Sequence, residues 1–251
     1  MIKKIEKMKD FLRKEAKKRG FKSVVFGLSG GIDSAVVGQL CAEVFSDKAK
    51  AFIMPSFLSN PQNTQDAIRF ARNISLNYEV IDISPLINAY IETLSLHNTA
   101  NNVLRVGNLC ARIRMGILYD KSVAHNALVV GCSNKSELML GYGTIFGDLA
   151  YAINPIGDLF KSEIFTLAKI LAIPNFIVAK KPSADLFAGQ SDEGDLGYSY
   201  EQIDKILKLI NKGLNPKEII ESGFKDDFVK FICKRVKRNK FKSELPKVLK
   251  L

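Results

Sequence analysis

The sequence contains no tryptophan, only two histidines and only four cysteines in 251 residues. No two cysteines form a C-x-x-C pair, which argues against a zinc knuckle or a thioredoxin-like motif. The histidines, His97 and His125, lie in unrelated contexts, so we expect no histidine-based metal site. Scattered thiols in a chain without an export signal are typical of a reducing cytoplasm, and we predict a cytoplasmic location.

Long apolar segments are also missing. No apolar run is long enough to cross a bilayer, so we expect no transmembrane helix and no membrane partner. The N-terminus has neither an apolar core nor a small-residue cleavage site, which argues against a signal peptide. The hydrophobic fraction of 47% and the charged fraction of 25% are ordinary for a soluble globular protein, and the length suits one well-buried α/β domain.

Positive charge is concentrated at the two ends of the chain. Residues 1–22 and residues 224–251 each contain ten basic and three acidic residues, a net +7 apiece, so the remaining middle carries −3 of the total +11. Two solvated basic helices explain this distribution most simply. Attraction for a polyanion, either nucleic acid or a phosphate-rich small molecule, is the alternative, and charge alone does not distinguish the two.

Short apolar runs alternate with segments of helical periodicity along most of the chain. We predict buried strands at residues 23–28 and 50–54, and a third and a fourth strand at residues 78–83 and 127–131. We predict helices at residues 1–20, 33–45, 63–74, from 85 onward, from 101 or 102 to about 125, 161–171, 200–210 and 226–236. This alternation predicts an α/β fold with a doubly wound, mostly parallel sheet, helices on both faces and right-handed crossovers. Ligands of such sheets bind beyond the carboxyl ends of the strands, so functional motifs should follow strands directly.

Residues 182–197 follow neither a helical nor a strand period. The segment contains Pro182, three glycines and four acidic residues. A loop of this length inside a compact domain is usually functional or mobile. We therefore predict a mobile active-site loop at residues 182–197.

A glycine-rich turn follows the first predicted strand, with the sequence Leu28-Ser29-Gly30-Gly31-Ile32-Asp33-Ser34. Two adjacent glycines let the backbone turn sharply and approach a ligand closely. Backbone N–H groups of the turn and of the following helix start form an anion nest, to which the two serines add hydroxyl donors. The aspartate suits a magnesium ion that the phosphates share. The turn therefore predicts a phosphate site.

This turn differs from a Walker A loop, because no Gly-Lys-Ser/Thr follows, and from the Rossmann fingerprint, because the G-x-G-x-x-G spacing is absent. For two adjacent glycines alone, a glycine turn with a serine cap would be the preferred interpretation. The run S-G-G-x-D-S between a strand and a helix, however, resembles the pyrophosphate-binding loop of the N-type ATP pyrophosphatases. Members of that superfamily activate a carboxylate or carbonyl by adenylation and release pyrophosphate.

A second polar segment, Asn134-Lys135-Ser136-Glu137, follows the fourth predicted strand. Taken alone it resembles a helix cap, with Glu137 as a first-turn acid that balances the helix dipole. Its position beside the first loop favours a further role, as a second carboxylate that completes a magnesium site with Asp33 and a triphosphate. Lys161 begins a predicted helix, where a lysine opposes the dipole, and this misfit suggests that it neutralises phosphate.

The order of the motifs S-G-G-x-D-S, N-K-S-E, G-D, N-P-I-G-D-L-x-K, K-P-S-A-D-L and D-E-x-x-L-G resembles the NAD synthetase family over about residues 21–200, and more weakly to residue 246. The resemblance implies an adenine-nucleotide alpha-hydrolase-like fold in a single domain, residues 1–251. It also implies ATP-dependent amidation of deamido-NAD to NAD through an acyl-adenylate, with release of AMP and pyrophosphate, as the final step of NAD biosynthesis. No residues remain for a glutaminase domain, so we expect ammonia to be the direct nitrogen donor.

The resemblance also implies roles for individual residues. The ATP phosphates would be held by Leu28, Ser29, Gly30, Gly31, Ile32, Asp33 and Ser34. Mg²⁺ would be bound by Asp33 and Glu137. ATP would also contact Cys132, Lys161 and Ser183. Deamido-NAD would contact Arg112, Asp148 and Lys242. Asp148 lies beside the reacting centre, where it would bind ammonium or accept its proton, and Lys161 would offset charge on the departing pyrophosphate.

Two further expectations and two rivals complete the hypothesis. Family members are homodimers whose dinucleotide site is shared between subunits, so the resemblance implies the same here. Some members have a lysine at the position of Ile145 and an aspartate at that of Ala152, and an arginine usually stands where this chain has Ser243. These departures concern dinucleotide binding.

The first rival is a tRNA-modifying ATP pyrophosphatase, which the missing C-x-x-C disfavours, so we expect no nucleic acid partner. The second is a non-catalytic nucleotide-binding regulator.

Overall fold

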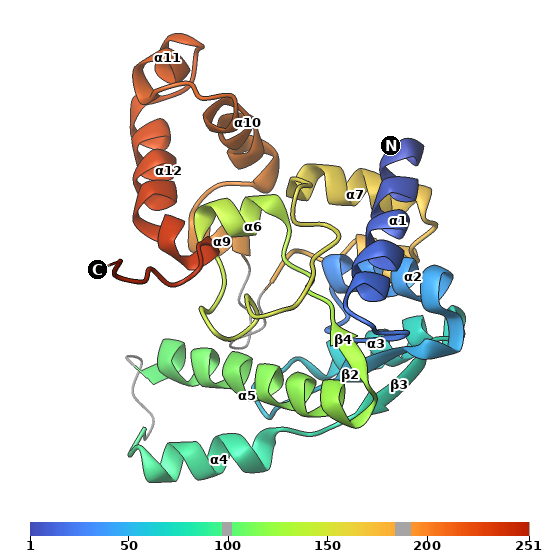
Figure 1. The fold of residues 1–251 in the computed structure, drawn as a ribbon. Helices are drawn as coiled ribbons and strands as arrows, with labels where there is room; N and C mark the ends of the chain where they lie inside the picture. The colour runs from blue at the N-terminus through green and yellow to red at the C-terminus, as the bar shows by residue number, and fades with distance from the viewer. Residues whose placement is uncertain (97–101, 184–191, 251) are drawn as a thin grey trace.

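The computed structural model describes residues 1–96, 102–183 and 192–250, and a four-stranded parallel sheet in the order β3-β2-β1-β4 lies at its centre (Figure 1). The strands are β1 (Ser23–Gly27), β2 (Ala49–Ile53), β3 (Asn77–Val80) and β4 (Ala127–Val129). In β1, Val25 pairs with Lys50 of β2 on one side and with Val129 of β4 on the other. A parallel bridge between Val130 and Ile153 continues the pairing past the end of β4.

Alternate strand residues face opposite sides of the sheet, and each side has its own apolar core. Val24 and Phe26 of β1 pack into one core, and Val25 packs into the other. The first core is covered by α1 (Ile2–Lys18), α2 (Ile32–Phe45), α3 (Pro61–Asn73), α7 (Lys161–Ile170) and α8 (Asn175–Val178). The second is covered by α4 (Ser84–Thr93) and α5 (Val103–Ala124). Because both faces of the central strands are covered, β1 and β4 have continuous apolar runs, whereas the edge strand β3 has no buried residue. The predicted doubly wound α/β fold is confirmed.

A third apolar cluster lies away from the sheet. It joins α6 (Lys135–Leu140), α9 (Asp192–Leu196), α10 (Tyr200–Asn211), α11 (Pro216–Glu221) and α12 (Asp226–Asn239), with α10, α11 and α12 at the upper left of Figure 1. Fully buried Ile206 and Val229 are at its centre. The cluster arises because α10 and α12 each have one apolar stripe that must be covered.

The strand order creates a switch point between β1 and β4. From β1 the chain moves outward through β2 to β3, and then returns to the other side of β1 to form β4. The segments that leave the carboxyl ends of β1 and β4 therefore run to different helices, α2 and α6. Ligands of open α/β sheets bind at such a switch point, and we call the region between the two segments the crevice. Both predicted polar motifs begin at this crevice.

Local structure differs from the expectations at several element ends, including those of the third strand and of the long loop. The third strand ends at Val80, before the predicted residue 83, although the N–H groups of Ile81 and Ile83 still donate to the carbonyls of Ile53 and Pro55 (2.9 Å each). The carboxylate of Asp82 then accepts from the N–H of Ser84 (2.9 Å), where α4 begins. The predicted loop at 182–197 is wrong at its end, because Asp192–Leu196 form the short helix α9. Residues 184–191 of that prediction lie outside the described part. Among the described helices, none is both long and apolar enough to span a membrane.

Candidate active site

The chain turns from β1 into α2 through Ser29, Gly30 and Gly31. Gly30 has a φ of +81°, and a Cβ placed there would lie 2.3 Å from the backbone oxygen of Asn63, so only glycine fits. The hydroxyl of Ser34 donates to the carbonyl of Gly31 (3.0 Å) and accepts from the N–H of Ser29 (3.2 Å). The turn is thus held in shape before any ligand binds, at the N-terminus of a fourteen-residue helix that favours anions.

The two apolar members of this motif, Leu28 and Ile32, are buried with 1% and 6% of their surface exposed. Their side chains pack into the core beneath the turn. A contact with ATP from these two positions would therefore have to come from the backbone. Leu28 is further fixed by its N–H, which donates to the carbonyl of Phe52 in the neighbouring strand segment (2.9 Å).

The segment after β4 begins α6 with a capping box. The side chain of Asn134 accepts from the N–H of Glu137 (3.0 Å), and the carboxylate of Glu137 accepts from the N–H of Asn134 (3.1 Å). The helix-cap interpretation of the sequence is therefore correct. Asn134 does more than cap, because its amide also donates to the carboxylate of Asp33 (2.9 Å). The cap thus connects the two motifs, which are about a hundred residues apart in sequence.

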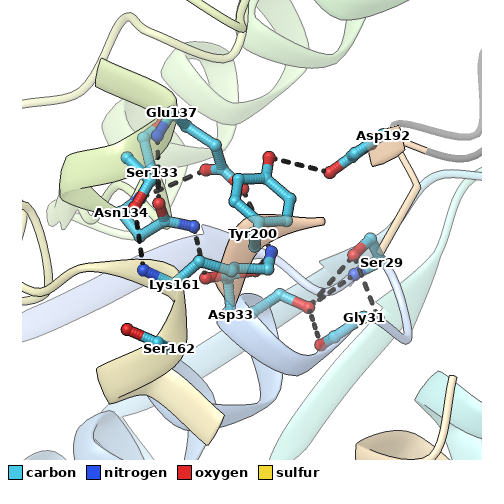
Figure 2. A network of polar contacts seen from close by, with 12 residues as sticks. Ser29, Gly31, Asp33, Ser133, Asn134, Glu137, Lys161, Ser162, Asp192 and Tyr200 are labelled. Atoms are coloured by element: carbon cyan, nitrogen blue, oxygen red, sulfur yellow. Dashed lines mark hydrogen bonds and ion pairs between the residues drawn. The ribbon is translucent and has the colours of Figure 1, made fainter. Parts of the chain in front are cut away.

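Lys161, the first residue of α7, points into the crevice between these motifs (Figure 2). Its side chain is only 3% exposed, and its ammonium donates to Asp33 and to Glu137, the latter at 3.1 Å. The two carboxylates compensate the unfavourable position of a lysine at a helix start. Sequence analysis predicted Asp33 and Glu137 as magnesium ligands and Lys161 as a phosphate contact, and the tertiary structure pairs Lys161 with both acids.

Burial and mutual charge shift the pKa values of this constellation. Burial alone would lower the pKa of Lys161, but the adjacent Asp33 and Glu137 carboxylates outweigh it and raise the pKa, so the lysine stays charged. Burial raises the pKa of Glu137, and Asp33 adds to the rise while Lys161 opposes it. Two largely buried acids thus share one ammonium, and a further cation at the site would favour the ionised form of Glu137.

This donor set fits Mg²⁺ in chemistry. Magnesium prefers oxygen ligands, binds proteins through one or two carboxylates and takes its remaining ligands from phosphates and water. Asp33 and Glu137 already converge on one cation, the Lys161 ammonium. No group of three or more metal-ligating His, Cys, Asp or Glu side chains occurs within residues 1–96, 102–183 and 192–250. A magnesium ion here would consequently depend on substrate phosphates for the rest of its coordination.

Asp192, at the start of α9, is an acid that sequence analysis did not assign to the site. It is 3% exposed, and one carboxylate oxygen accepts from the hydroxyl of Tyr200 (3.2 Å) (Figure 2). Its other oxygen is buried and has no hydrogen-bond partner among the described residues. Burial raises its pKa, and the Lys161 charge opposes the rise. Its position in an acid-rich, aperiodic segment was the available signal.

Asp204 was also missed, and it holds the two helix starts together. Its carboxylate accepts from the hydroxyl of Ser136 on α6 (2.5 Å) and from the N–H of Ser162 on α7 (2.8 Å). The same Ser136 hydroxyl accepts from the N–H of Lys161 (2.9 Å). Asp204 is 1% exposed, which explains why an acid stands between the apolar residues of α10. That interruption of an apolar stripe was the signal in the sequence.

The residues predicted to contact deamido-NAD lie on the other side of the crevice. Asp148 accepts from the N–H of Thr144 (2.8 Å); it retains contact with solvent, but desolvation by the surrounding protein raises its pKa. Lys242, in the segment after α12, donates to the carbonyls of Gly141 and Gly143 (2.9 and 3.0 Å), and burial lowers its pKa. Arg112 is exposed on α5, with one long bond to the carbonyl of Ile145 (3.5 Å).

The two remaining residues that were predicted to contact ATP are Cys132 and Ser183. The thiol of Cys132 points back toward the end of β1, 3.8 Å from the carbonyl of Gly27, and burial raises its pKa, so it is a neutral group. Ser183 is exposed and is the final described residue before the gap at 184–191. Cys132 is therefore brought to the crevice, whereas Ser183 lies exposed at the edge of the described residues.

Known proteins match this chain over nearly its whole length. The family described as NAD synthase matches residues 4–246. The NH(3)-dependent NAD(+) synthetase of Helicobacter pylori (strain ATCC 700392 / 26695) is 51% identical and covers 96% of this chain and 93% of that protein. The structure of the NH3-dependent NAD synthetase from Campylobacter jejuni in complex with the nitrate ion has a TM-score of 0.84 and 40% identity, and covers 99% and 98%.

A further structural match concerns an NMN synthetase. The structure of that enzyme from Francisella tularensis has a TM-score of 0.87 and 30% identity, and it covers 99% of this chain and 98% of its own. Sequence, fold and site geometry agree, and the chain belongs to the NAD synthase family.

Proposed function

We propose that this protein makes NAD by ATP-dependent amidation of deamido-NAD with ammonia, and releases AMP and pyrophosphate. The observation that carries the proposal is the convergence of Asp33, Asn134, Glu137 and Lys161 at the switch point of the sheet, beside a preformed phosphate turn. High identity to NH(3)-dependent NAD(+) synthetases over nearly the full chain supports it.

The first step activates a poor electrophile. A nicotinate carboxylate oxygen attacks the α-phosphorus of ATP, the bond from that phosphorus to the bridging oxygen breaks, and pyrophosphate leaves. Negative charge develops on the departing pyrophosphate, and the N–H groups of the turn together with Lys161 would offset it. Mg²⁺ held by Asp33 and Glu137 would add charge stabilisation on the same phosphates when bound. In this role Lys161 leaves one carboxylate partner and binds phosphate.

The second step forms the amide. Ammonia attacks the carbonyl carbon of the acyl-adenylate, a proton is lost from nitrogen, and AMP leaves with the electron pair of the broken C–O bond. Asp148 would accept the proton or hold the incoming ammonium. Its position supports this role, because Asp148 is exposed and its carboxylate is open to an incoming molecule. Exclusion of water matters here, since an acyl-adenylate hydrolyses readily.

We further propose a homodimer that shares the dinucleotide site. The exposed face of α4 and α5 carries large apolar residues, among them Leu94, Leu104 and Val123, the last two 64% and 84% exposed. Next to it a cavity of about 260 Å³ contains Arg112 and Arg105 in its lining. A second copy would cover the apolar face and bring a neighbouring chain beside these arginines.

The dimer is tested by light scattering on the protein and on two charge variants. Leu104→Glu should convert a dimer to a monomer and reduce amidation at low dinucleotide concentration. Ile2→Glu, at a similarly exposed position on α1, should leave the dimer intact. A monomeric parent protein with full activity would contradict the proposal.

The NMN synthetase similarity favours a second candidate substrate. Ile145 and Ala152 stand where some relatives have charged contacts to the dinucleotide, so the adenylate half of deamido-NAD has less to bind here. Nicotinate mononucleotide, the carboxylate form of NMN, lacks that half. Competition between the two carboxylates at equal concentration, followed by product analysis, decides the matter. A ratio of catalytic efficiencies above one for deamido-NAD supports the primary proposal, and a ratio below one supports the second.

Location, domain count and nucleic acid binding are part of the same proposal. We place the protein in the cytoplasm as one catalytic domain, and we assign the basic ends to solvated surface. The four cysteines are free thiols, as a reducing compartment requires. Binding to tRNA, with a steep dependence on salt, would instead favour the tRNA-modifying alternative.

The central experiment is an assay with ATP, Mg²⁺, deamido-NAD and either ammonium or glutamine, in which NAD, AMP and pyrophosphate are all measured. We expect NAD with ammonium alone, in equal amounts with AMP and pyrophosphate. AMP and pyrophosphate without NAD would mean that the adenylation is correct but the acceptor or the nitrogen donor is wrong. No product of any kind would favour a non-catalytic nucleotide-binding regulator.

A further inference from the structure

Lys180 connects the phosphate turn to the neighbouring helix α3. Its ammonium donates to the carbonyl of Gly30 (3.3 Å), to the side-chain oxygen of Asn63 (2.9 Å) and to the carboxylate of Asp66 (2.5 Å). Asn63 lies in the first turn of α3, against which Gly30 packs so closely that no Cβ would fit. One side chain thus holds three groups, one in the phosphate turn and two on α3.

The contact with Gly30 matters because of the peptide that it fixes. A peptide unit between two glycines has little steric resistance to rotation, so either its carbonyl or its N–H can face a ligand. In a trans peptide the carbonyl and the N–H point in opposite directions. With the carbonyl of Gly30 held by Lys180, the N–H of Gly31 points away from Lys180, toward the hydroxyl of Ser29 (3.2 Å). A flipped peptide would present a carbonyl to phosphate and repel it.

Asp66 keeps Lys180 in place. Its side chain is 7% exposed and also accepts from the amide of Gln62 (2.9 Å). Burial opposes its ionisation, but the hydrogen bonds from Lys180 and Gln62 outweigh burial and lower its pKa, so it is a carboxylate at neutral pH. A buried carboxylate paired with a lysine is a well-fixed anchor compared with an exposed ion pair.

We propose that Lys180 is a positioning residue for ATP: anchored by Asp66, it sets the orientation of the Gly30–Gly31 peptide. The N–H of Gly31, which donates to the Ser29 hydroxyl in the free protein, is thereby kept on the side of the turn where it can bind the departing pyrophosphate. The inference rests on the proposed ATP site at this turn. None of the family-derived roles includes Lys180, which stands three residues before the predicted ATP contact Ser183.

The test compares binding of a non-hydrolysable ATP analogue with Mg²⁺, and of AMP, by calorimetry. Lys180→Met should weaken binding of the ATP analogue about 10- to 100-fold, as expected for loss of a hydrogen bond from a charged group, with little change for AMP. Lys180→Arg should recover part of the loss. Lys50→Met is the matched control, because Lys50 has a similar ion pair with Glu79 (2.8 Å) on the β2–β3 side of the sheet. The affinity of this variant for the ATP analogue and for AMP should not change.

Asp66→Asn distinguishes positioning from direct contact. If Lys180 acts through the peptide, loss of its anchor should weaken binding of the ATP analogue. If Lys180 instead binds phosphate itself, removal of the competing carboxylate should strengthen binding and overturn the proposal. Equal loss of ATP analogue and AMP, or unchanged affinity in Lys180→Met, would also overturn it. The unmodified protein is assayed for NAD separately, so failure of the amidation proposal is recorded independently of these binding data.

Discussion

The two sides of the crevice differ in how completely they are formed. On the ATP side, Asp33, Asn134, Glu137 and Lys161 contact one another directly, and every one of them is buried or nearly so. On the proposed dinucleotide side, Arg112 is exposed and its bond to the carbonyl of Ile145 is long, and Lys242 donates to backbone carbonyls. The first side is a preorganised network, and the second is a set of separate groups that a ligand or a second subunit must complete.

This contrast is consistent with the substrate that we propose for each side. Preorganised charge stabilises a transition state without reorganisation, so the ATP side is suited to chemistry. Groups that are incompletely paired in the free protein gain contacts on binding, so the dinucleotide side is suited to recognition. Changes on the first side should lower turnover or stability, and changes on the second should raise the KM of one substrate.

The largest expected effect is on turnover. Asp33→Asn removes one of two carboxylates that converge on the buried cation and should lower NAD formation by more than about 10³-fold, the size seen when a key electrostatic group is lost. Steady-state assays with saturating substrates measure it. Asp158→Asn, at a highly exposed acid in an ion pair with Lys135, is the control and should retain activity. Substantial turnover in Asp33→Asn would refute the assignment of this carboxylate.

The next effect is on stability. Lys161→Met leaves Asp33 and Glu137 buried without their ammonium and should lower the free energy of unfolding by about 3–5 kcal/mol. Urea unfolding at neutral pH measures it. Combination with Asp33→Asn should restore part of the loss, because one unpaired negative charge is removed. A variant as stable as the parent protein would mean that the network is not preorganised.

On the dinucleotide side we expect a selective and smaller effect. Lys242→Met should raise the KM for deamido-NAD about tenfold, as expected when one charged contact is lost, and leave the KM for ATP unchanged. Initial rates at varied concentrations of each substrate separate the two constants. Lys247→Met, in the exposed C-terminal tail, should change neither constant. A parallel rise in both constants would remove the distinction between the two sides.

The smallest effect concerns the anchor of the phosphate turn. The folded-state pKa of Asp66 lies below its ordinary value, so its ionised form stabilises the protein above about pH 4, and this contribution is lost as the pH falls through the folded-state pKa. Asp66→Asn should therefore cost about 1–2 kcal/mol at pH 7 and progressively less at acid pH. Chemical denaturation of both proteins at pH 7 and pH 3 measures the difference. A pH-independent difference would indicate a purely steric effect.

Much of the fold and part of the site could be predicted locally. Apolar runs predicted β1, β2 and β4, and a segment of mixed polarity predicted β3. The glycines and the Asn134 cap predicted two polar turns at strand ends. Asp192 and Asp204 were not predicted, because an acid in a loop or on an apolar helix stripe shows no partner in sequence. The short helix α9 was missed for a related reason, since five residues are too few to display a helical period.

The sequence by itself determined the alternation of strands and helices, the phosphate turn and, through its motifs, the family, because these depend on neighbouring residues and on the period of burial. Only the tertiary structure decided which charges meet. Lys161 reaches Asp33 across 128 residues, and Lys180 reaches Gly30 across 150. A hydrophobic period specifies the face that a helix buries, but the partner of each buried polar group depends on the strand order, which places the ends of β1 and β4 side by side.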